Sequence, residues 1–366
     1  MSSKSLKEAE RVMTICNACR YCEGFCAVFP AMELRRTFTE PDLKYLSNLC
    51  HNCRDCYYAC QYAPPHEFDV NVPRSLAELR VETYREFAWP GIFSGLFRFN
   101  GWWVSFVAAV CVVVALLLVG LGQPPEVFFG IHTGENAFYR VVSYPAMVLT
   151  FSVLALCVVI CLWRCFCGFW QGTGKSLNAL LDLRAHLRAI SDVLRLKYLD
   201  GGGYGCNYPD DRFSMLRKYL HHAVFYGFLF CLASTTVAAF YDHLLHLAAP
   251  YPVLSWPVIL GSIGGGALLV GAGGLLYFKF TMDTRPALQG TFGMDVAFIA
   301  LLWLTAFTGI LLLILRATPM MGTLLTIHLG MVAGLFLSMP YSKFVHGVYR
   351  YAALVRNAAE QEHTKQ

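Results

Sequence analysis

The chain has 366 residues, of which 56% are hydrophobic and only 14% charged. Because soluble globular domains average about 25% charged residues, this composition indicates a membrane protein, with enough length for a small additional domain. The net charge of +5 is mild, and no stretch combines basic with aromatic residues, which argues against a nucleic-acid-binding protein.

The N-terminal residues "MSSKSLKEAERVMTIC" are polar and contain neither the apolar segment nor the cleavage site of a secretory signal. We therefore expect the N-terminal region to remain in the cytoplasm. Closely spaced cysteines in that reducing compartment are more often metal ligands than disulfides.

Two cysteine runs share the spacing C-x2-C-x2-C-x3-C: "CNACRYCEGFC" at residues 16–26 and "CHNCRDCYYAC" at residues 50–60. A short loop with this spacing can bind three irons of a cubane cluster, and the fourth ligand comes from further along the chain. In the two-cluster pattern each fourth cysteine binds the other cluster, which predicts two [4Fe–4S] clusters. The predicted ligands are Cys16, Cys19, Cys22 and Cys60 for the first cluster, and Cys50, Cys53, Cys56 and Cys26 for the second.

Zinc is the alternative, but zinc sites usually pair two C-x2-C motifs, so the third cysteine of each run would be surplus. Unlike in compact bacterial ferredoxins, proline does not directly follow the fourth cysteine. Apolar residues at helical spacing between the runs, with Pro41 at a helix start, predict a helical connector. Residues 1–98 thus resemble the helical ferredoxin domain of fumarate reductase and heterodisulfide reductase subunits.

Six long apolar stretches follow, each near or above the ~20 residues that a helix needs to cross a bilayer. The alternative of buried helices in a soluble core is disfavoured by their number. The predicted spans are at about 101–122, 143–163, 221–243, 253–278, 295–315 and 320–342. The predicted fold is therefore all-α: a double [4Fe–4S] domain followed by a six-helix transmembrane bundle at 99–350 and a tail at 351–366.

Lys and Arg lie almost entirely on one side of this predicted topology. Of the 29 Lys and Arg residues, 27 lie in residues 1–100, the loop 164–218, the segment 279–293 and the C-terminal residues 343–366. Since positive residues concentrate on the cytoplasmic side, we expect a multi-pass protein of the bacterial inner membrane. Both termini and the 164–218 loop would then be cytoplasmic.

The cytoplasmic loop contains "SLNALLDLRAHLRAISDVLRLKYL" at residues 176–199, with apolar residues at helical spacing. This pattern predicts an amphipathic helix on the membrane surface or on a partner, or equally a helix packed on the N-terminal domain. The following "GGGYGCNYPDD" lacks the Lys-Ser/Thr ending of a phosphate loop, so we predict no nucleotide site there.

Histidines lie near both ends of the third and sixth predicted spans. His328 and His346 are 18 residues apart, five helical turns, which would place them on one helix face. Facing histidines on antiparallel helices are typical of haem ligands in bundles, although a single histidine at a helix end is more often a polar interfacial residue. The predicted axial ligands of one or two b-type haems are His222 with His346 and His243 with His328, with His221 and His246 as alternates.

Cysteines outside the two runs are weaker candidates. Cys161, Cys165 and Cys167 lie at the cytoplasmic end of a span and fit as small apolar residues. Cys206 lies near the start of the third span, where it is a candidate redox-active thiol.

The chain resembles the tricarballylate-utilisation B family, also called citrate-utilisation B, over essentially its whole length. The resemblance rests on the doubled cysteine run together with "GGGYGC", "RKYLHHAVFYGF" and "H…SKFVHGVYR". The membrane half is similar in plan to the gamma subunit of respiratory nitrate reductase. The resemblance implies an electron conduit. A separate FAD-dependent dehydrogenase, the tricarballylate-utilisation A type, oxidises tricarballylate or a related tricarboxylate, and this protein reoxidises its flavin and delivers electrons to quinone.

No G-x-G-x-x-G follows a predicted strand, so we expect an oxidoreductase component without a substrate-dehydrogenating site of its own. Two alternatives belong to other classes. One is the electron-donating subunit of a thiol–disulfide reductase, with Cys206 as a candidate thiol. The other is a membrane redox sensor that signals through the 164–218 loop and needs neither quinone nor haem.

Overall fold

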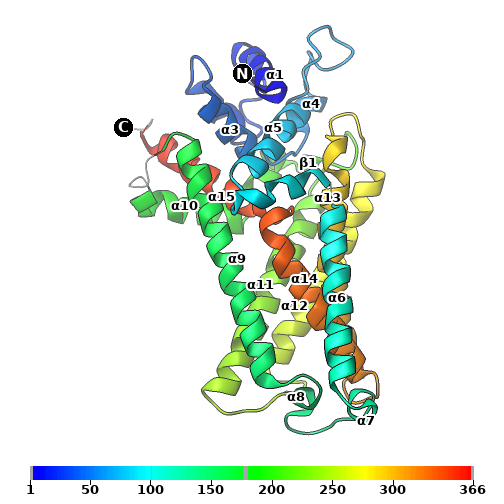
Figure 1. Cartoon of the computed structure of the whole chain (residues 1–366). Coiled ribbons are helices and arrows are strands. Elements are labelled where there is room, and N and C mark those ends of the chain that lie inside the picture. Colours follow the sequence, from blue (N-terminus) through cyan, green and yellow to red (C-terminus); the bar gives the residue numbers. More distant parts are fainter. Residues whose placement is uncertain (1–2, 100, 176–179, 364–366) are drawn as a thin grey trace.

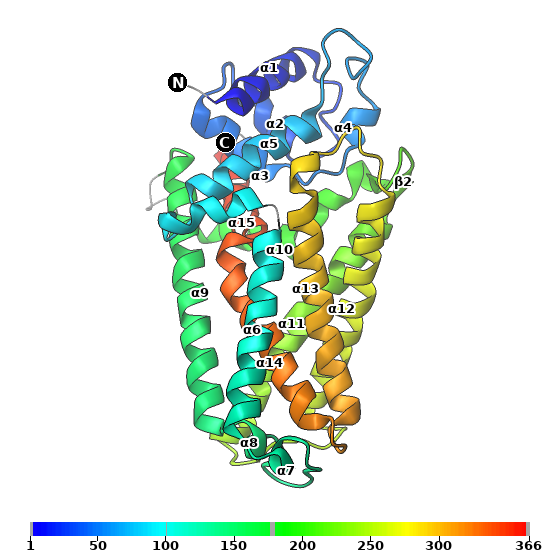
Figure 2. The ribbon, with the colours of Figure 1, turned by 45° about the vertical axis from the view of Figure 1, so that its right-hand side comes forward.

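The computed structural model describes residues 3–99, 101–175 and 180–363. A helical domain at 3–99 lies on one end of a bundle of long helices (Figure 1 and Figure 2). We call it the cysteine domain, the end of the bundle beneath it the near end, and the opposite end the far end. Six helices in the described residues are long and apolar enough to cross a membrane, so the predicted all-α fold with a six-helix transmembrane bundle is confirmed.

Short helices connected by turns form the cysteine domain. They are α1 (Lys4–Cys19), α2 (Val28–Glu33), α3 (Glu40–Leu49), α4 (Asp55–Tyr58), α5 (Val72–Glu86) and the 3-10 helix η1 (Gly91–Phe99). The predicted helical connector is present as α2 and α3, with Pro41 in the first turn of α3. Thr39 and Asp42 form a capping box, in which each side chain accepts the backbone amide of the other residue. Apolar side chains of α1, α2, α3 and α5 share one core.

Four of the six spanning helices extend further at the near end than the apolar stretches predict. They are α6 (Trp102–Gly122), α9 (Tyr144–Gly172), α11 (Leu216–His243), α12 (Trp256–Thr281), α13 (Phe292–Leu315) and α14 (Met321–Ser338). α9 continues to Gly172, beyond the predicted end of the second span at residue 163. Its last turns bury Cys165, Phe169 and Trp170 in the core of the cysteine domain, so tertiary packing prolongs the helix.

Glycines allow close approach between the helices of the bundle. A Cβ atom at Gly334 of α14 would lie 2.7 Å from Ala108 Cα of α6. One at Gly264 of α12 would lie 2.8 Å from the carbonyl oxygen of Gly227 in α11. Small residues at helix crossings let backbones pack tightly in a bilayer, where the hydrophobic effect between helices is absent. These contacts set α14 beside α6 and α12 beside α11.

The remaining elements lie at the two ends of the bundle. They are α7 (Pro125–Phe128), α8 (Ala137–Val141), α10 (Leu183–Leu194), η3 (Lys197–Leu199), η4 (Gly201–Gly203), β1 (Cys206–Asn207), β2 (Phe213–Ser214), η5 (Gln289–Thr291), η6 (Met339–Tyr341) and α15 (Val345–His363). β1 and β2 pair in antiparallel fashion. α7 and α8 lie at the far end, whereas α10, α15 and β1 lie at the near end (Figure 1).

The helix predicted at residues 176–199 is present in part as α10, and residues 176–179 lie outside the described part of the chain. One face of α10 packs on α15 through Ala185 and Ala189, which are fully buried. Leu187, on another face, is 59% exposed. Packing on the protein therefore accounts for one face of this helix, and an apolar face stays open.

α14 and α15 are separate helices, which corrects two expectations. The prediction that His328 and His346 share one helix face is wrong, because α14 ends at Ser338 and η6 separates it from α15. Within the predicted tail at 351–366, the described residues 351–363 form most of α15, in which Ala353 is fully buried. Apolar residues recur at helical spacing between polar ones in α15, a pattern suited to packing on a protein surface.

Candidate cofactor sites

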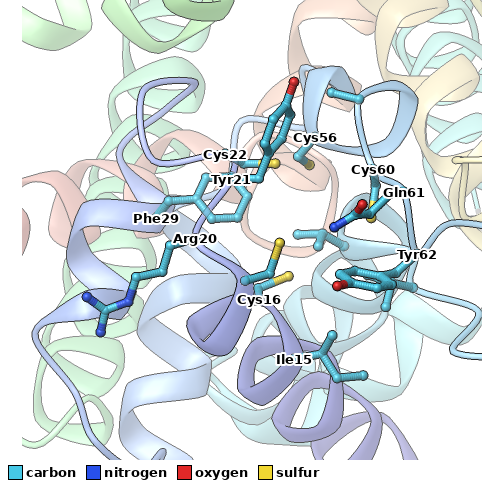
Figure 3. Close-up of a pocket in the computed structure, with 14 residues that line it drawn as sticks. Ile15, Cys16, Arg20, Tyr21, Cys22, Phe29, Cys56, Cys60, Gln61 and Tyr62 are labelled. Atoms are coloured by element: carbon cyan, nitrogen blue, oxygen red, sulfur yellow. The ribbon is translucent and has the colours of Figure 1, made fainter.

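The first cysteine set consists of Cys16, Cys19, Cys22 and Cys60. α1 ends at Cys19, and the left-handed backbone of Arg20 (φ 55°) turns the chain toward Cys22. Cys60 follows α4 by two residues. All four cysteines line one cavity of about 230 Å³, shown in Figure 3. The structure thus groups three cysteines of the first run with the last cysteine of the second run, as the predicted crossed pattern requires.

The cavity of the first set lies near the protein surface. Tyr21, which lines it, is 71% exposed, while Phe29, which also lines it, belongs to the domain core. Burial, followed by the charges of Cys22 and Cys60, raises the pKa of Cys16 to about 12. These thiols therefore lose their protons at neutral pH only when a bound metal centre stabilises the negative charge of the thiolates.

The second cysteine set consists of Cys26, Cys50, Cys53 and Cys56. Cys50 directly follows α3, Cys56 lies in α4, and Cys26 precedes α2 by two residues. Cys50, Cys53 and Cys56 are only 7%, 5% and 7% exposed. Burial, followed by the charge of Cys26, raises the pKa of Cys53 well above its usual range. These thiols are thus mutual neighbours, again in the crossed pattern, but in a closed environment.

The two cysteine sets adjoin each other at Cys56. This residue belongs to the second set, yet its side chain also lines the cavity of the first set. Burial raises the pKa of Cys56, and the neighbouring charges that add to this effect include that of Cys22. Metal centres held by the two sets would therefore be direct neighbours.

A single ion and a cubane cluster require different spacing between their thiolate ligands. Zinc holds its thiolate ligands at about 2.3 Å, which brings the sulfur atoms close together. No group of three or more His, Cys, Asp or Glu side chains in the described residues is arranged to hold one metal ion. A cubane presents its irons at separate corners, each with its own thiolate. Its four cysteine ligands are therefore further apart than the ligands of a single zinc ion. The [4Fe–4S] clusters themselves stay a prediction.

Three arginines hold the loop that carries the second set. Arg80 and Arg350 each donate through Nη2 to the carbonyl oxygen of Cys50, over 2.8 and 2.9 Å. Arg217 donates through Nη1 to the carbonyl oxygen of Asn52 over 2.6 Å. Arg80 lies in α5, whereas the other two belong to α11 and α15. The loop is therefore attached to the spanning bundle and to the C-terminal helix as well as to its own domain.

A histidine pair lies at the near end of the bundle. The ring centroids of His221 in α11 and His346 in α15 are 6.3 Å apart, with an angle of 76° between the planes. Nδ1 of His346 hydrogen-bonds to the Lys343 carbonyl oxygen over 2.5 Å, which leaves Nε2 for another partner. Nδ1 of His221 is buried and has no hydrogen-bond partner among the described residues. Metal-bound histidines often anchor one nitrogen on a carbonyl in this way, so the pair fits a shared axial site.

This geometry distinguishes the alternatives for the near-end ligand. His221 faces His346, whereas the ring of His222 lies 5.6 Å from that of Tyr226. Burial, followed by the charge of Arg350, holds the pKa of His346 well below its usual range. A neutral imidazole is the form that binds iron. Haem ligation itself stays a prediction.

The far-end histidines contact other partners. Nε2 of His243 hydrogen-bonds to the Tyr144 hydroxyl over 2.9 Å, and the side chain is exposed. His328 hydrogen-bonds through Nδ1 to Thr308 Oγ1 over 3.1 Å and lies against Gly309 of α13. His246 is also exposed. The structure thus gives these histidines separate neighbours and does not reproduce the compact arrangement of the near-end pair.

The weaker cysteine candidates outside the two sets are buried or half-buried. Cys165 is fully buried in the core of the cysteine domain, and Cys161 and Cys167 are half-buried. Cys206 is 0% exposed and shares a small core with Cys53. Since thiol exchange requires access for an attacking thiolate, this burial disfavours Cys206 as a redox-active thiol.

Sequence reasoning missed the arginines around the second cysteine set. Their signal is present in the sequence, because Arg217 precedes His221 by four residues and Arg350 follows His346 by four. Residues four apart on a helix share one face. The same pattern also occurs by chance on any polar helix, so the tertiary contacts are needed to give it meaning.

Comparisons with known proteins cover almost the whole chain. The family model described as citrate utilization protein B matches residues 103–366. A second model, the citrate utilization protein B Fer4-like domain, matches residues 9–86. Citrate utilization protein B of Escherichia coli is 44% identical over 361 residues, which are 98% of this chain and 93% of that protein. No solved structure matches the chain.

Proposed function

The chain belongs to the citrate utilization protein B family, and from this premise we propose that it transfers electrons from the reduced flavin of a partner dehydrogenase to membrane quinone. The Fer4-like domain and the six apolar helices support an iron–sulfur electron-transfer role in a multi-pass membrane protein. The proposal further specifies two [4Fe–4S] clusters, a b-type haem, a flavoprotein partner and quinone as the acceptor.

The observation that carries the proposal is the order of the two cysteine sets. The first set lines a cavity near the outer surface of the cysteine domain, where a soluble partner can approach. The second set is buried and linked through Arg217 and Arg350 to helices that reach the bundle. Two sets that adjoin each other at Cys56 favour electron entry at the first and exit at the second.

The chain's own residues supply the ligands and their environment. Cys16, Cys19, Cys22 and Cys60 would hold the first cluster, and Cys26, Cys50, Cys53 and Cys56 the second. His221 and His346 would hold a b-type haem at the near end. When bound, these groups act as one-electron carriers whose potentials depend on hydrogen bonds, charge and burial.

The partner and the orientation follow from the same premise. The proposed donor is an FAD-dependent dehydrogenase that oxidises tricarballylate or a related tricarboxylate. Since Lys and Arg concentrate at the near end, the cysteine domain and both termini would face the cytoplasm of a bacterial inner membrane. A far-end haem at His243 and His328, with His246 as alternate, is the less supported part, because these side chains have other neighbours.

A spectrum of the purified protein tests the cofactors. We expect a dithionite-reduced-minus-oxidised spectrum with b-type bands and about eight non-haem irons per chain. His221→Ala should remove the bands of the near-end haem, and His222→Ala, its neighbour in sequence, should retain them. Clusters without any haem bands would contradict the proposed role of the histidines.

A coupled assay tests the electron path. Reduced partner flavoprotein, mixed with the detergent-solubilised protein and a soluble quinone, should have its flavin reoxidised while quinol forms. The same mixture without this protein provides the control. Absence of flavin reoxidation by an intact complex would overturn the proposed function.

A further inference from the structure

Two arginines from outside the cysteine domain hold the backbone of the second cysteine set. Arg350 Nη2 donates to the carbonyl oxygen of Cys50 over 2.9 Å. Arg217 Nη1 donates to the carbonyl oxygen of Asn52 over 2.6 Å, and Arg217 Nη2 donates to the carbonyl oxygen of His51 over 3.4 Å. The contacts join segments that are about 165 to 300 residues apart in the sequence. These hydrogen bonds attach the loop that follows Cys50 to α11 and α15.

Each of these arginines is one helical turn from a member of the histidine pair. Arg217 and His221 are four residues apart in α11, and His346 and Arg350 are four apart in α15. Side chains at this spacing lie on the same helix face. Each helix therefore presents a guanidinium to the cysteine loop and an imidazole to the pair beneath it.

The two charges also act on the thiols of the second set. Arg217 interacts electrostatically with Cys206 and Tyr208 and, after them, with Cys53. Arg350 interacts with Arg80 and Tyr84 and, after them, with Cys50. Both arginines are half-buried, and charge interactions are stronger there than in open solvent. By contrast, Arg20 in the wall of the first cavity is exposed to solvent.

We propose that Arg217 and Arg350 are positioning residues for electron exit, which hold the second cluster against the histidine pair and raise its reduction potential. This inference rests on the proposed function. Reduction adds one negative charge to a cluster, and buried cations and fixed hydrogen bonds stabilise that charge. The same two contacts fix the distance from the cysteine loop to the imidazoles.

The test is a redox titration of intact, detergent-solubilised protein, followed by electron paramagnetic resonance. The signal of the second cluster is identified by its loss in Cys53→Ser. The variants are Arg217→Gln and Arg350→Gln, with Arg217→Lys and Arg350→Lys keeping the charge but losing the planar fork. Arg184→Gln is the matched control, since it removes an equal charge from an exposed position in α10.

We expect each glutamine variant to shift the reduction equilibrium of the second cluster at least tenfold against the reduced form, which is about 59 mV for one electron. The first cluster and the Arg184→Gln protein should keep wild-type potentials, and the lysine variants should show a smaller shift. A merely structural role would lower cluster content or stability without moving the potential.

An assembled second cluster with wild-type potential in both glutamine variants would overturn this inference alone. If the glutamine variants do not assemble the cluster, the lysine variants decide: a lowered potential supports the inference, and an unchanged one overturns it. Wild-type protein without any cluster signals would overturn the proposed function together with this inference.

Discussion

The two cysteine sets have the same sequence spacing but different surroundings. The first lines a cavity next to the exposed Tyr21, and its cysteines are half-buried. Three members of the second are nearly inaccessible, and Arg80, Arg217 and Arg350 hold its loop. Identical motifs can therefore be given different roles by segments that lie far away in the sequence. In the proposed function, the first set would receive electrons from a partner and the second would pass them inward.

Removal of one ligand from each set gives the largest expected effect. Cys19→Ser and Cys53→Ser should each lose about four irons, and quinone reduction should fall to background in both because the carriers act in series. Iron analysis and paramagnetic resonance measure the loss. Cys19→Ser should keep the signal of the second cluster, and Cys53→Ser that of the first.

Cys165→Ser provides a control, since this buried cysteine belongs to neither set. It should retain all the iron. Loss of both clusters in only one of the two ligand variants would show that assembly is sequential, and equal loss of both in each variant would contradict two separate sites.

Iron removal by a chelator should distinguish the two sets by rate. The first set opens to the surface, whereas the second requires the cysteine domain to separate from α11 and α15 before solvent enters. We expect iron from the first cluster to be released about tenfold faster or more, equivalent to about 1.4 kcal/mol of additional opening free energy for the second. Stopped-flow absorbance with a ferrous chelator measures both phases. Release in a single phase would contradict the difference in access.

The smallest expected effect concerns the attachment of α3 to α15. Asp42 accepts hydrogen bonds from Arg35 Nε over 2.7 Å and from Arg356 Nη2 over 2.9 Å. Asp42→Asn removes one of the two carboxylates that these cations contact, while Glu360 remains within 2.8 Å of both, and it should destabilise the cysteine domain by about 1 kcal/mol. Glu8→Gln, which breaks the exposed pair with Arg11, should cost less than about 0.5 kcal/mol. Thermal unfolding of both variants measures the difference.

The contribution of Asp42 should also depend on pH. Burial by itself would raise the pKa of Asp42, but hydrogen bonds from Thr39 and Arg35 and the charge of Arg356 hold it at about 2. Since the ordinary pKa is higher, this stability is complete above about pH 4 and is lost as the pH falls toward 2. In Asp42→Asn this part of the acid sensitivity should disappear, and an unchanged acid profile would contradict the assignment.

Much of this molecule could be predicted because its signals are local. The crossed grouping of cysteines depends on spacings within 45 residues, and the structure reproduces it in both sets. The spans follow from the length of apolar stretches, although α9 runs nine residues past its predicted end. That extension depends on Phe169 and Trp170 packing into the cysteine domain, which no local pattern reveals.

The histidines show where sequence reasoning stops. Five turns between His328 and His346 place them on one face only if a single helix joins them, and η6 interrupts that helix. The choice between His221 and His222 depends on the rotation of α11 about its axis. Adjacent residues on a helix point about 100° apart, so neither spacing nor composition could decide it.

The sequence by itself determined the two cysteine sets and the six apolar spans, because cysteine spacing and hydrophobic length are properties of short segments. Only the tertiary structure decided which set is buried, which histidine faces His346 and which arginines hold the second loop. These depend on how α11 and α15 are rotated and docked on the cysteine domain. That docking is a long-range packing outcome in which residues more than 300 positions apart meet.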